Sequence, residues 1–184
     1  TDCKTGPNII KEIARLRELT FRYVGEGTGQ KQDTDKYDKY YKHIIVWDEE
    51  ELEIVGSYRV GLGSEIMEKF GFKGFYASSL FKFKEKFIED YLPYSLEVGR
   101  SFVQRKYWNS NALHYLWLGL GAYIAVNPDI KYLFGPVSLS NSMEKSAKEL
   151  VILYFNKWFG SKEKLAEANN EVIIGNETLK IFKD

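Results

Sequence analysis

One carboxylate and one guanidinium stand out in this chain because they interrupt an apolar, strand-like stretch. Residues 95–103 read Ser-Leu-Glu-Val-Gly-Arg-Ser-Phe-Val, with Glu97 and Arg100 three positions apart. In a regular strand this spacing places the two side chains on opposite faces, unless Gly99 marks a bulge that turns them together. Burying either charge without a partner would cost several kcal/mol. Each therefore needs a partner, which is either another charge across the sheet or a ligand.

A second candidate site lies just before the apolar stretch 112–126. Asn109, Ser110 and Asn111 are residues of the type that begins helices. A helix N-terminus offers free backbone amides and the positive end of a dipole, which suits a pyrophosphate or the phosphate of a phosphopantetheine arm. Residues 104–111 contain no glycine, so the shape of a phosphate site is expected here without its usual signature.

Both candidate sites belong to one unit, residues 94–140, which reads strand, polar turn, long apolar helix, strand. Such a connection implies two parallel strands. The apolar stretch is short for a membrane span, so we expect a helix buried against the sheet, with His114 in the core. Gly119 and Gly121 would let this helix approach the sheet or a ligand closely.

The elements outside this unit are predicted from periodicity and turn residues. Residues 8–21 have the spacing of an amphipathic helix, and 43–47 and 52–60 read as a hairpin around the acidic turn 48–51. The remaining expectations are a helix at 64–70, a short strand at 75–80, a helix from an Asn141–Glu144 capping pair to Phe159, a short helix from Ser161 and a closing hairpin at 172–182. The fold class is therefore α+β, with a mixed sheet.

Composition limits the classes of function. The chain has 184 residues, which suits a single domain over residues 1–184. Lys plus Arg and Asp plus Glu number 26 each, which argues against general nucleic-acid binding. The single cysteine, Cys3, cannot form an internal disulfide, so we expect a reducing compartment, the cytoplasm. The chain begins at Thr1 without an apolar signal region, so we expect it to be processed, trimmed or part of a longer protein.

No metal site is predicted. The two histidines, His43 and His114, are too few for a Cys/His site. Asp33, Asp35 and Asp38 lie within six residues, but their spacing does not fit an EF-hand loop.

Five stretches carry a resemblance to a known family. They are Arg17 and Phe21 in the first helix, the aspartate-rich segment 33–38, Gly-Ser-Tyr-Arg at 56–59, Leu-Glu-Val-Gly-Arg-Ser at 96–101 and Leu-Phe-Gly at 133–135. Together they resemble the GNAT-type N-acyltransferases that make ornithine and glycine lipids, often labelled hemolysin-like, which are similar to acyl-homoserine-lactone autoinducer synthases. The match runs over about residues 9–140. The sequence departs from the GNAT pattern at 106–111, where the glycine-rich pyrophosphate loop is replaced, and it ends earlier than family members do, which implies that a C-terminal segment is lacking.

The resemblance implies a GNAT-like fold, with a mixed, mostly antiparallel sheet, a parallel strand-helix-strand centre and helices on both faces. It places Arg17, Phe21, Asp35, Asp38 and Arg59 at the substrate site, with Glu97 and Arg100 at the catalytic centre. The expected reaction transfers a long-chain, 3-hydroxy or unmodified, fatty acyl group from an acyl carrier protein or coenzyme A thioester to the amine of an amino acid. No permanently bound cofactor is expected. The partners would be the carrier protein and the acceptor amino acid, with peripheral association at the inner membrane surface and no transmembrane segment.

Within that mechanism the residues take chemical roles. An amine attacks a thioester only when unprotonated, so Glu97 could remove the proton directly or through water if burial raises its pKa. Backbone amides at Val98 and Gly99 could polarise the thioester carbonyl. Arg100 or Arg59 could hold the carboxylate of the acceptor or the phosphate of the donor arm.

Two other functions stay open from the residues alone. A small-molecule acetyltransferase would use acetyl-coenzyme A and would need no space for a long chain. A non-catalytic module that binds acyl groups or carrier proteins would keep a basic surface and need no base.

Overall fold

The computed structural model describes residues 1, 4 and 6–183. Its centre is a four-stranded sheet in the order β1-β2-β4-β5, formed by β1 (Lys42–Asp48), β2 (Glu53–Leu62), β4 (Ser95–Val103) and β5 (Tyr132–Phe134). The pairs β1/β2 and β2/β4 are antiparallel, whereas β4/β5 is parallel. The predicted mixed, mostly antiparallel sheet is therefore confirmed. Cys3 lies outside the described residues, so its role stays a prediction.

The predicted parallel unit is present. Strand β4 leads into α4 (Ala112–Ala125) and then into β5, where Leu96 pairs with Leu133 and Glu97 with Phe134. The strand β5 ends at Phe134 because Gly135 and Pro136 follow, and a Cβ at Gly135 would lie 2.0 Å from the Val98 carbonyl oxygen. The strand β5 is therefore short, and the chain that follows it departs from the sheet close to β4.

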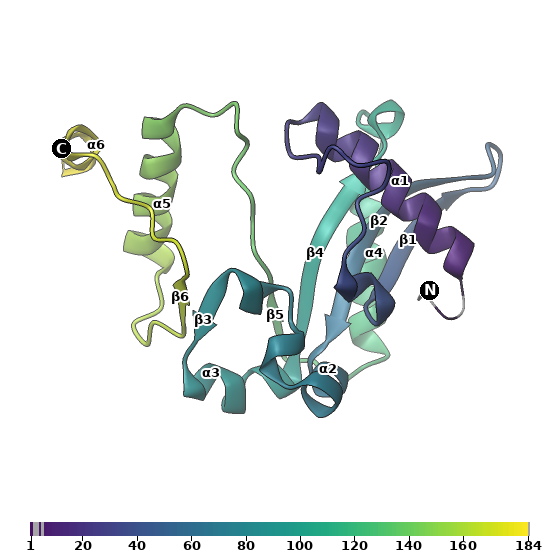
Figure 1. Cartoon of the computed structure of the whole chain (residues 1–184), viewed down its shortest axis with the longest axis horizontal. Coiled ribbons are helices and arrows are strands. Elements are labelled where there is room, and N and C mark those ends of the chain that lie inside the picture. The colour runs from purple at the N-terminus through teal and green to yellow at the C-terminus, as the bar shows by residue number, and fades with distance from the viewer. Residues whose placement is uncertain (2–3, 5, 184) are drawn as a thin grey trace.

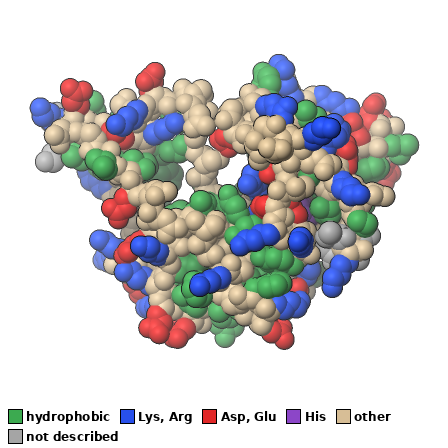
Figure 2. All heavy atoms as spheres, in the orientation of Figure 1, with side chains coloured by type: hydrophobic (Ala, Val, Ile, Leu, Met, Phe, Trp, Pro, Cys, Tyr) green, Lys and Arg blue, Asp and Glu red, His purple; other side chains and the backbone are tan. Residues whose placement is uncertain are grey.

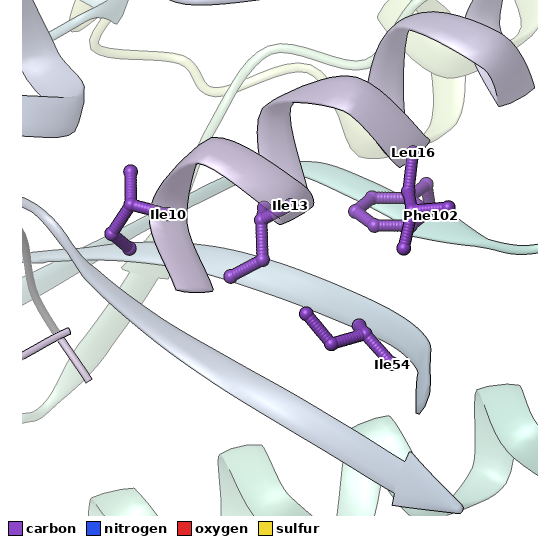
Figure 3. Close-up of a cluster of buried hydrophobic side chains, with 5 residues drawn as sticks. All are labelled: Ile10, Ile13, Leu16, Ile54 and Phe102. Atoms are coloured by element: carbon purple, nitrogen blue, oxygen red, sulfur yellow. The ribbon is translucent and has the colours of Figure 1, made fainter. Parts of the chain in front are cut away.

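Helices cover both faces of the sheet, as predicted (Figure 1). On one face lies α1 (Pro7–Tyr23), which begins at a proline that suits the first helical turn. Its apolar stripe of Ile10, Ile13 and Leu16 points at Ile54 of β2 and Phe102 of β4 (Figure 3). On the other face α4 packs against β1 and β2, with Leu120 beside Val60 and Leu96.

The prediction of a helix buried against the sheet at 112–126 is wrong in part. Only Ala112, Leu116 and Leu120 of α4 are buried. The opposite side, with Leu113, Tyr115, Trp117 and Leu118, is about half exposed, because the described residues place no element over it. His114 is exposed with it, so the expectation of a core histidine is also wrong. Of the two glycines only Gly119 makes a close approach, where a Cβ would lie 2.8 Å from Ile44, and Gly121 faces open space.

The residues on either side of β4, 63–94 and 105–107, form short elements around the sheet. They are α2 (Gly63–Phe70), β3 (Phe81–Phe83), α3 (Glu85–Asp90) and the 3₁₀ turns η2 (Phe72–Gly74), η3 (Ala77–Ser79), η4 (Leu92–Tyr94) and η5 (Arg105–Tyr107), with η1 (Lys36–Lys39) preceding β1. The helix predicted at 64–70 is confirmed, but the strand predicted at 75–80 is wrong. There the hydroxyls of Ser78 and Ser79 donate to the carbonyls three residues earlier, which favours a turn.

The C-terminal third departs furthest from the sequence expectations. Helix α5 (Lys145–Phe159) ends before Gly160 as predicted, but it begins without a capping pair, because Asn141 donates to the Gly25 carbonyl instead. The helix predicted from Ser161 is replaced by a turn and β6 (Ala166–Ala168), which pairs with β3. The hairpin predicted at 172–182 is replaced by a loop and α6 (Asn176–Lys183).

Figure 1 shows α5 and α6 standing apart from the four-stranded sheet, joined to it through the β3/β6 pair and through the extended segment after β5. The single-domain prediction stays a prediction. Within the described residues, no helix combines the length and the apolar character needed to cross a membrane.

Candidate active site

A β-bulge in β4 sets the geometry of the site. Arg59 pairs with Gly99 and Ser57 with Phe102, so β4 has one more residue than β2 between these pairs. Arg100 sits in the bulge with a φ of 48°, in the left-handed region. The bulge that the sequence left open as an alternative at Gly99 is therefore present, but the unusual backbone falls on Arg100 rather than on Gly99. As a result the guanidinium groups of Arg59 and Arg100 both lie 5.4 Å from the ring centre of Tyr76.

Three arginines and three aspartates form an ionic network beneath this bulge, in which Asp35 is 21% exposed, Arg100 is 22% exposed and the other four members are buried. Arg17 of α1 donates to Asp33 at 3.0 Å and to Asp38 at 2.9 Å. Arg59 donates to Asp35 at 2.7 Å and to Asp38 at 3.1 Å. Arg100 completes the network by donating to Asp33 at 2.9 Å. The predicted residues Arg17, Asp35, Asp38, Arg59 and Arg100 are thus brought together.

The network favours the charged forms of Asp38 and Arg59. Burial alone would raise the pKa of Asp38, but the hydrogen bond and the charge of Arg17, with the charge of Arg59, lower this pKa to about 2. Burial likewise opposes the charged form of Arg59, and the nearby Asp35 and Asp38 carboxylates reverse this and raise its pKa. Asp33, which joins Arg17 to Arg100, was not among the predicted site residues. Its position in the aspartate-rich segment, two residues before Asp35, was the available signal.

Glu97 is buried on the same side of β4 and anchors a loop. Its carboxylate accepts hydrogen bonds from the Tyr41 hydroxyl and from the backbone amides of Tyr76 at 3.0 Å and Ala77 at 2.6 Å. Burial raises the pKa of Glu97, and these three hydrogen bonds offset only part of the rise. The pKa of the Tyr41 phenol is also raised, first by burial and then by the Glu97 charge. Tyr41 therefore stays a hydrogen-bond donor to Glu97.

A pocket of about 500 Å³ lies between β4 and the chain that follows β5. Its walls include the predicted residues Phe21, Val98, Gly99 and Arg100, together with Glu26, Tyr58, Tyr76, Leu80, Ser101 and residues 135–138. The other predicted residues, Arg17, Asp35, Asp38, Arg59 and Glu97, lie behind this lining. The structure thus divides the predicted set into residues that face the pocket and residues that support them.

Glu26 is the pocket carboxylate that sequence reasoning missed. Its backbone amide donates to the Phe21 carbonyl at 2.7 Å, and its side chain accepts from the Ser138 hydroxyl at 2.9 Å. The loop that carries it is held by Glu18, which accepts from the Thr28 amide and hydroxyl and from the Gly29 amide. The contact of Glu26 with Ser138 joins residues that are far apart in sequence, so the residues next to Glu26 do not indicate that it belongs to the site.

Asn109, Ser110 and Asn111 lie at the start of α4, away from Glu97. Ser110 lines a second pocket of about 330 Å³ together with Ser101, Phe102, Val103, Tyr107, Trp108, Leu113 and Leu116. The Ser110 hydroxyl accepts from the Ala112 amide at 3.2 Å, whereas Asn111, at the N-cap position, makes no side-chain capping bond. Neither Asn109 nor Asn111 lines the pocket. Ser101 lines both pockets, so the two are neighbours along β4.

Metal binding finds no support in the described residues, where no three His, Cys, Asp or Glu side chains are grouped so that they could hold an ion. The three aspartates of the network are instead engaged by arginines.

Comparison with known proteins places this chain in a family. A model described as "Acetyltransferase (GNAT) domain" matches residues 16–118, which include the whole network, Glu97 and the start of α4. A "Glycine N(alpha)-acyltransferase" of Phocaeicola vulgatus is 41% identical over 171 residues, covering 87% of this chain and 52% of that protein. A protein of the same name from Bacteroides thetaiotaomicron is 37% identical over 182 residues, covering 93% of this chain and 54% of its own length. The chain thus spans about half the length of these curated relatives, and no solved structure matches it.

Proposed function

The chain belongs to the family of GNAT acetyltransferase domains, and on this premise we propose that it is an N-acyltransferase that joins a fatty acyl group to the amine of an amino acid. The donor is a thioester on a phosphopantetheine arm, carried by an acyl carrier protein or by coenzyme A. The two relatives are named for glycine, so glycine is the acceptor that we test first. The product class is an acylated amino acid of the kind used in aminolipids, made in the cytoplasm at the inner membrane surface.

One observation carries the acceptor assignment. Arg100 lines the pocket, and its Nε is buried with no hydrogen-bond partner among the described residues. A buried donor without a partner costs free energy, which a ligand with an acceptor oxygen would recover. The carboxylate of an amino acid supplies such an oxygen and pairs well with a guanidinium. Glu26, in the same lining, attracts the amine end of the acceptor.

Glu97 is the proposed base. Its raised pKa suits a group that must accept a proton near neutral pH. Tyr76 lines the pocket and also contacts Glu97 through its backbone amide, so the proton of the amine reaches the carboxylate past Tyr76 through a water molecule. The free amine nitrogen then attacks the thioester carbon, the carbon–sulfur bond breaks, and the thiolate leaves and takes up a proton. Backbone amides at Val98 and Gly99 beside the bulge polarise the carbonyl oxygen during this step.

The two neighbouring pockets give the proposed path of the phosphopantetheine arm that carries the donor thioester. Its phosphate end lies near Ser110 at the N-terminus of α4, where the helix dipole favours an anion, and Asn109 and Asn111 flank Ser110 in sequence. Its thioester end passes Ser101 into the pocket that holds Arg100. No covalent acyl-enzyme is required.

The test is mass spectrometry of products after incubation with a long-chain acyl carrier protein, with acetyl-coenzyme A and with a panel of amino acids. We expect N-acyl glycine, and we expect Glu97→Gln to lower kcat by about 10²–10⁴-fold. Glu26→Gln should raise the KM for glycine with a smaller effect on kcat. If no N-acyl amino acid forms, the function is wrong, and if only acetylated amines form, the small-molecule acetyltransferase is correct. Unchanged turnover in the Glu97→Gln variant would remove the assignment of the base.

A further inference from the structure

A cluster of lysines surrounds a surface hollow on the side of the molecule that carries η1 and α2. Lys4, Lys36, Lys39, Lys42, Lys69 and Lys73, here called the lysine patch, line a pocket of about 690 Å³. Figure 2 shows blue side chains spread over the face turned to the viewer, several of them among green side chains in its lower part. The whole chain carries equal numbers of acidic and basic residues, so this concentration of positive charge is local.

Three of these six lysines have no carboxylate partner among the described residues. Glu65 is the carboxylate among the lining residues, and it pairs with Lys42 at 2.8 Å and with Lys69 at 3.8 Å. In the part of the chain that the structure describes, no carboxylate lies within ion-pair distance of Lys36, Lys39 or Lys73. Gathering like charges raises the free energy of the folded chain, and a polyanionic partner would relieve that repulsion.

The shape of the patch selects the kind of partner. Its lining is partly aromatic, with the rings of Tyr40 and Phe70 4.3 Å apart between centres, and Phe70 is 49% exposed. Tyr40 is fixed by its hydrogen bond to the Gly74 carbonyl at 2.6 Å. A planar lipid surface would cover the opening of such a hollow and leave its interior unfilled. A convex acidic element with apolar side chains fills the hollow and pairs with the rim.

The patch lies close to the active-site pocket. Gly74 lines the lysine patch and Tyr76 lines the pocket that contains Arg100. Two residues of chain span at most about 7 Å, so the linings of the two sites are neighbours. A partner docked on the patch therefore holds anything attached to it beside the pocket.

We propose that the lysine patch is the docking surface for the acidic carrier protein that delivers the acyl thioester. This inference rests on the proposed N-acyltransferase function, and it adds the place where the carrier protein binds. Charge complementarity of this type mainly speeds association and weakens as salt screens it.

The experiment compares two triple charge reversals in the purified protein. The test variant is Lys36→Glu, Lys39→Glu, Lys73→Glu. The matched control is Lys11→Glu, Lys82→Glu, Lys162→Glu, which changes the net charge equally at exposed lysines outside the patch. Each is assayed for glycine acylation with two donors of the same chain length, an acyl carrier protein and an acyl-pantetheine that has neither carrier nor phosphate.

We expect the patch variant to raise the KM for the acyl carrier protein by about tenfold or more, with the kinetics for acyl-pantetheine unchanged. The control should match the wild type with both donors, and the wild-type KM for the carrier protein should rise with ionic strength. Equal carrier KM values in the two variants would overturn the docking site while leaving the function intact, because acyl-pantetheine would still be used. If the patch variant instead loses only its binding to anionic phospholipid vesicles, the surface is a membrane site and the inference is wrong. No turnover of either donor by the wild type would mean that the function itself has failed.

Discussion

At the scale of single residues, the site is a buried set of charges in which nearly every member has a partner. His43 of β1 is the exception. Its ring is 4% exposed, it lies 3.6 Å from Asp38, and neither of its ring nitrogens has a hydrogen-bond partner among the described residues. Burial lowers the pKa of His43 to about 4, although the Asp38 charge opposes this, and the charges of Arg17 and Arg59 lower it further. The histidine is therefore neutral in the folded protein at neutral pH.

This gives a prediction for stability against pH. Because the folded pKa of His43 lies below its ordinary value of 6.5, the unfolded chain binds more protons between pH 6.5 and 4. His43 therefore destabilises the protein as pH falls through that range, by on the order of 3 kcal/mol. His43→Gln should remove this part of the slope in urea unfolding at pH 4 to 7.

The matched control is His114→Gln, at the other histidine of the chain, which is exposed on α4. It should keep the wild-type slope. Glu97, with its raised pKa, has the opposite sign, because its folded form holds a proton more tightly and stability falls as it ionises. The difference between the wild type and His43→Gln isolates the histidine, and two parallel curves would show that His43 does not carry the effect.

At the scale of elements, α4 offers two glycines with different surroundings. Alanine is favoured over glycine within a helix by about 1 kcal/mol. At Gly121 a Cβ meets nothing within 4 Å, so Gly121→Ala should stabilise the protein by about that amount. At Gly119 a Cβ would lie 2.8 Å from the stiff, branched side chain of Ile44 on β1, so Gly119→Ala should gain less or lose stability. Chemical unfolding of the two variants measures the difference, and equal gains would contradict the close packing of α4 on the sheet.

Elements whose structure follows from local pattern could be predicted from the sequence. The apolar spacing of α1, the acidic turn between β1 and β2 and the strand-helix-strand unit around α4 all match the structure. Two segments that were predicted as β structure are not, and each is held by a buried glutamate from a distant element. Glu97 binds the amides of Tyr76 and Ala77, and Glu149 binds the Gly175 amide and the Thr178 hydroxyl. The β propensity of a segment does not indicate such distant hydrogen-bond partners.

The candidate site also has features that could be predicted from local sequence and features that depend on distant residues. The need of Glu97 and Arg100 for partners follows from the cost of burying charge. Which carboxylate Arg100 binds depends on the bulge and on the path of residues 33–38, and the place of Glu26 depends on a contact with Ser138, 112 residues away in sequence. These are properties of the assembled sheet rather than of any one stretch.

At the scale of the whole molecule, α5 and α6 are linked to the sheet more weakly than the sheet elements are linked to one another. Glu149 of α5 is 3% exposed and joins α5 to α6 through Gly175 and Thr178. Glu149→Ala should speed amide hydrogen exchange in α6 without changing exchange in β4. Glu144→Ala, at an exposed position just before α5, is the control and should leave both unchanged. Faster exchange in β4 as well would show that the two regions unfold as one unit, which would support the single-domain prediction.

The ionic network beneath the bulge also bears on how this site can change over generations. Its arginines and aspartates come from α1, from the segment that precedes β1, and from the strands β2 and β4. Every member therefore forms an ion pair with at least one residue far from it in sequence. Removing one partner of a buried ion pair costs about 3–5 kcal/mol, whereas replacing a pair together by well-packed apolar residues can cost nothing. A typical domain is stable by only about 5–15 kcal/mol, so a lineage that loses Arg17 or Asp38 alone passes through a barely folded intermediate. We therefore expect the six charged residues to be kept or replaced together during evolution. A designer who wishes to alter them should substitute both partners of an ion pair in a single step.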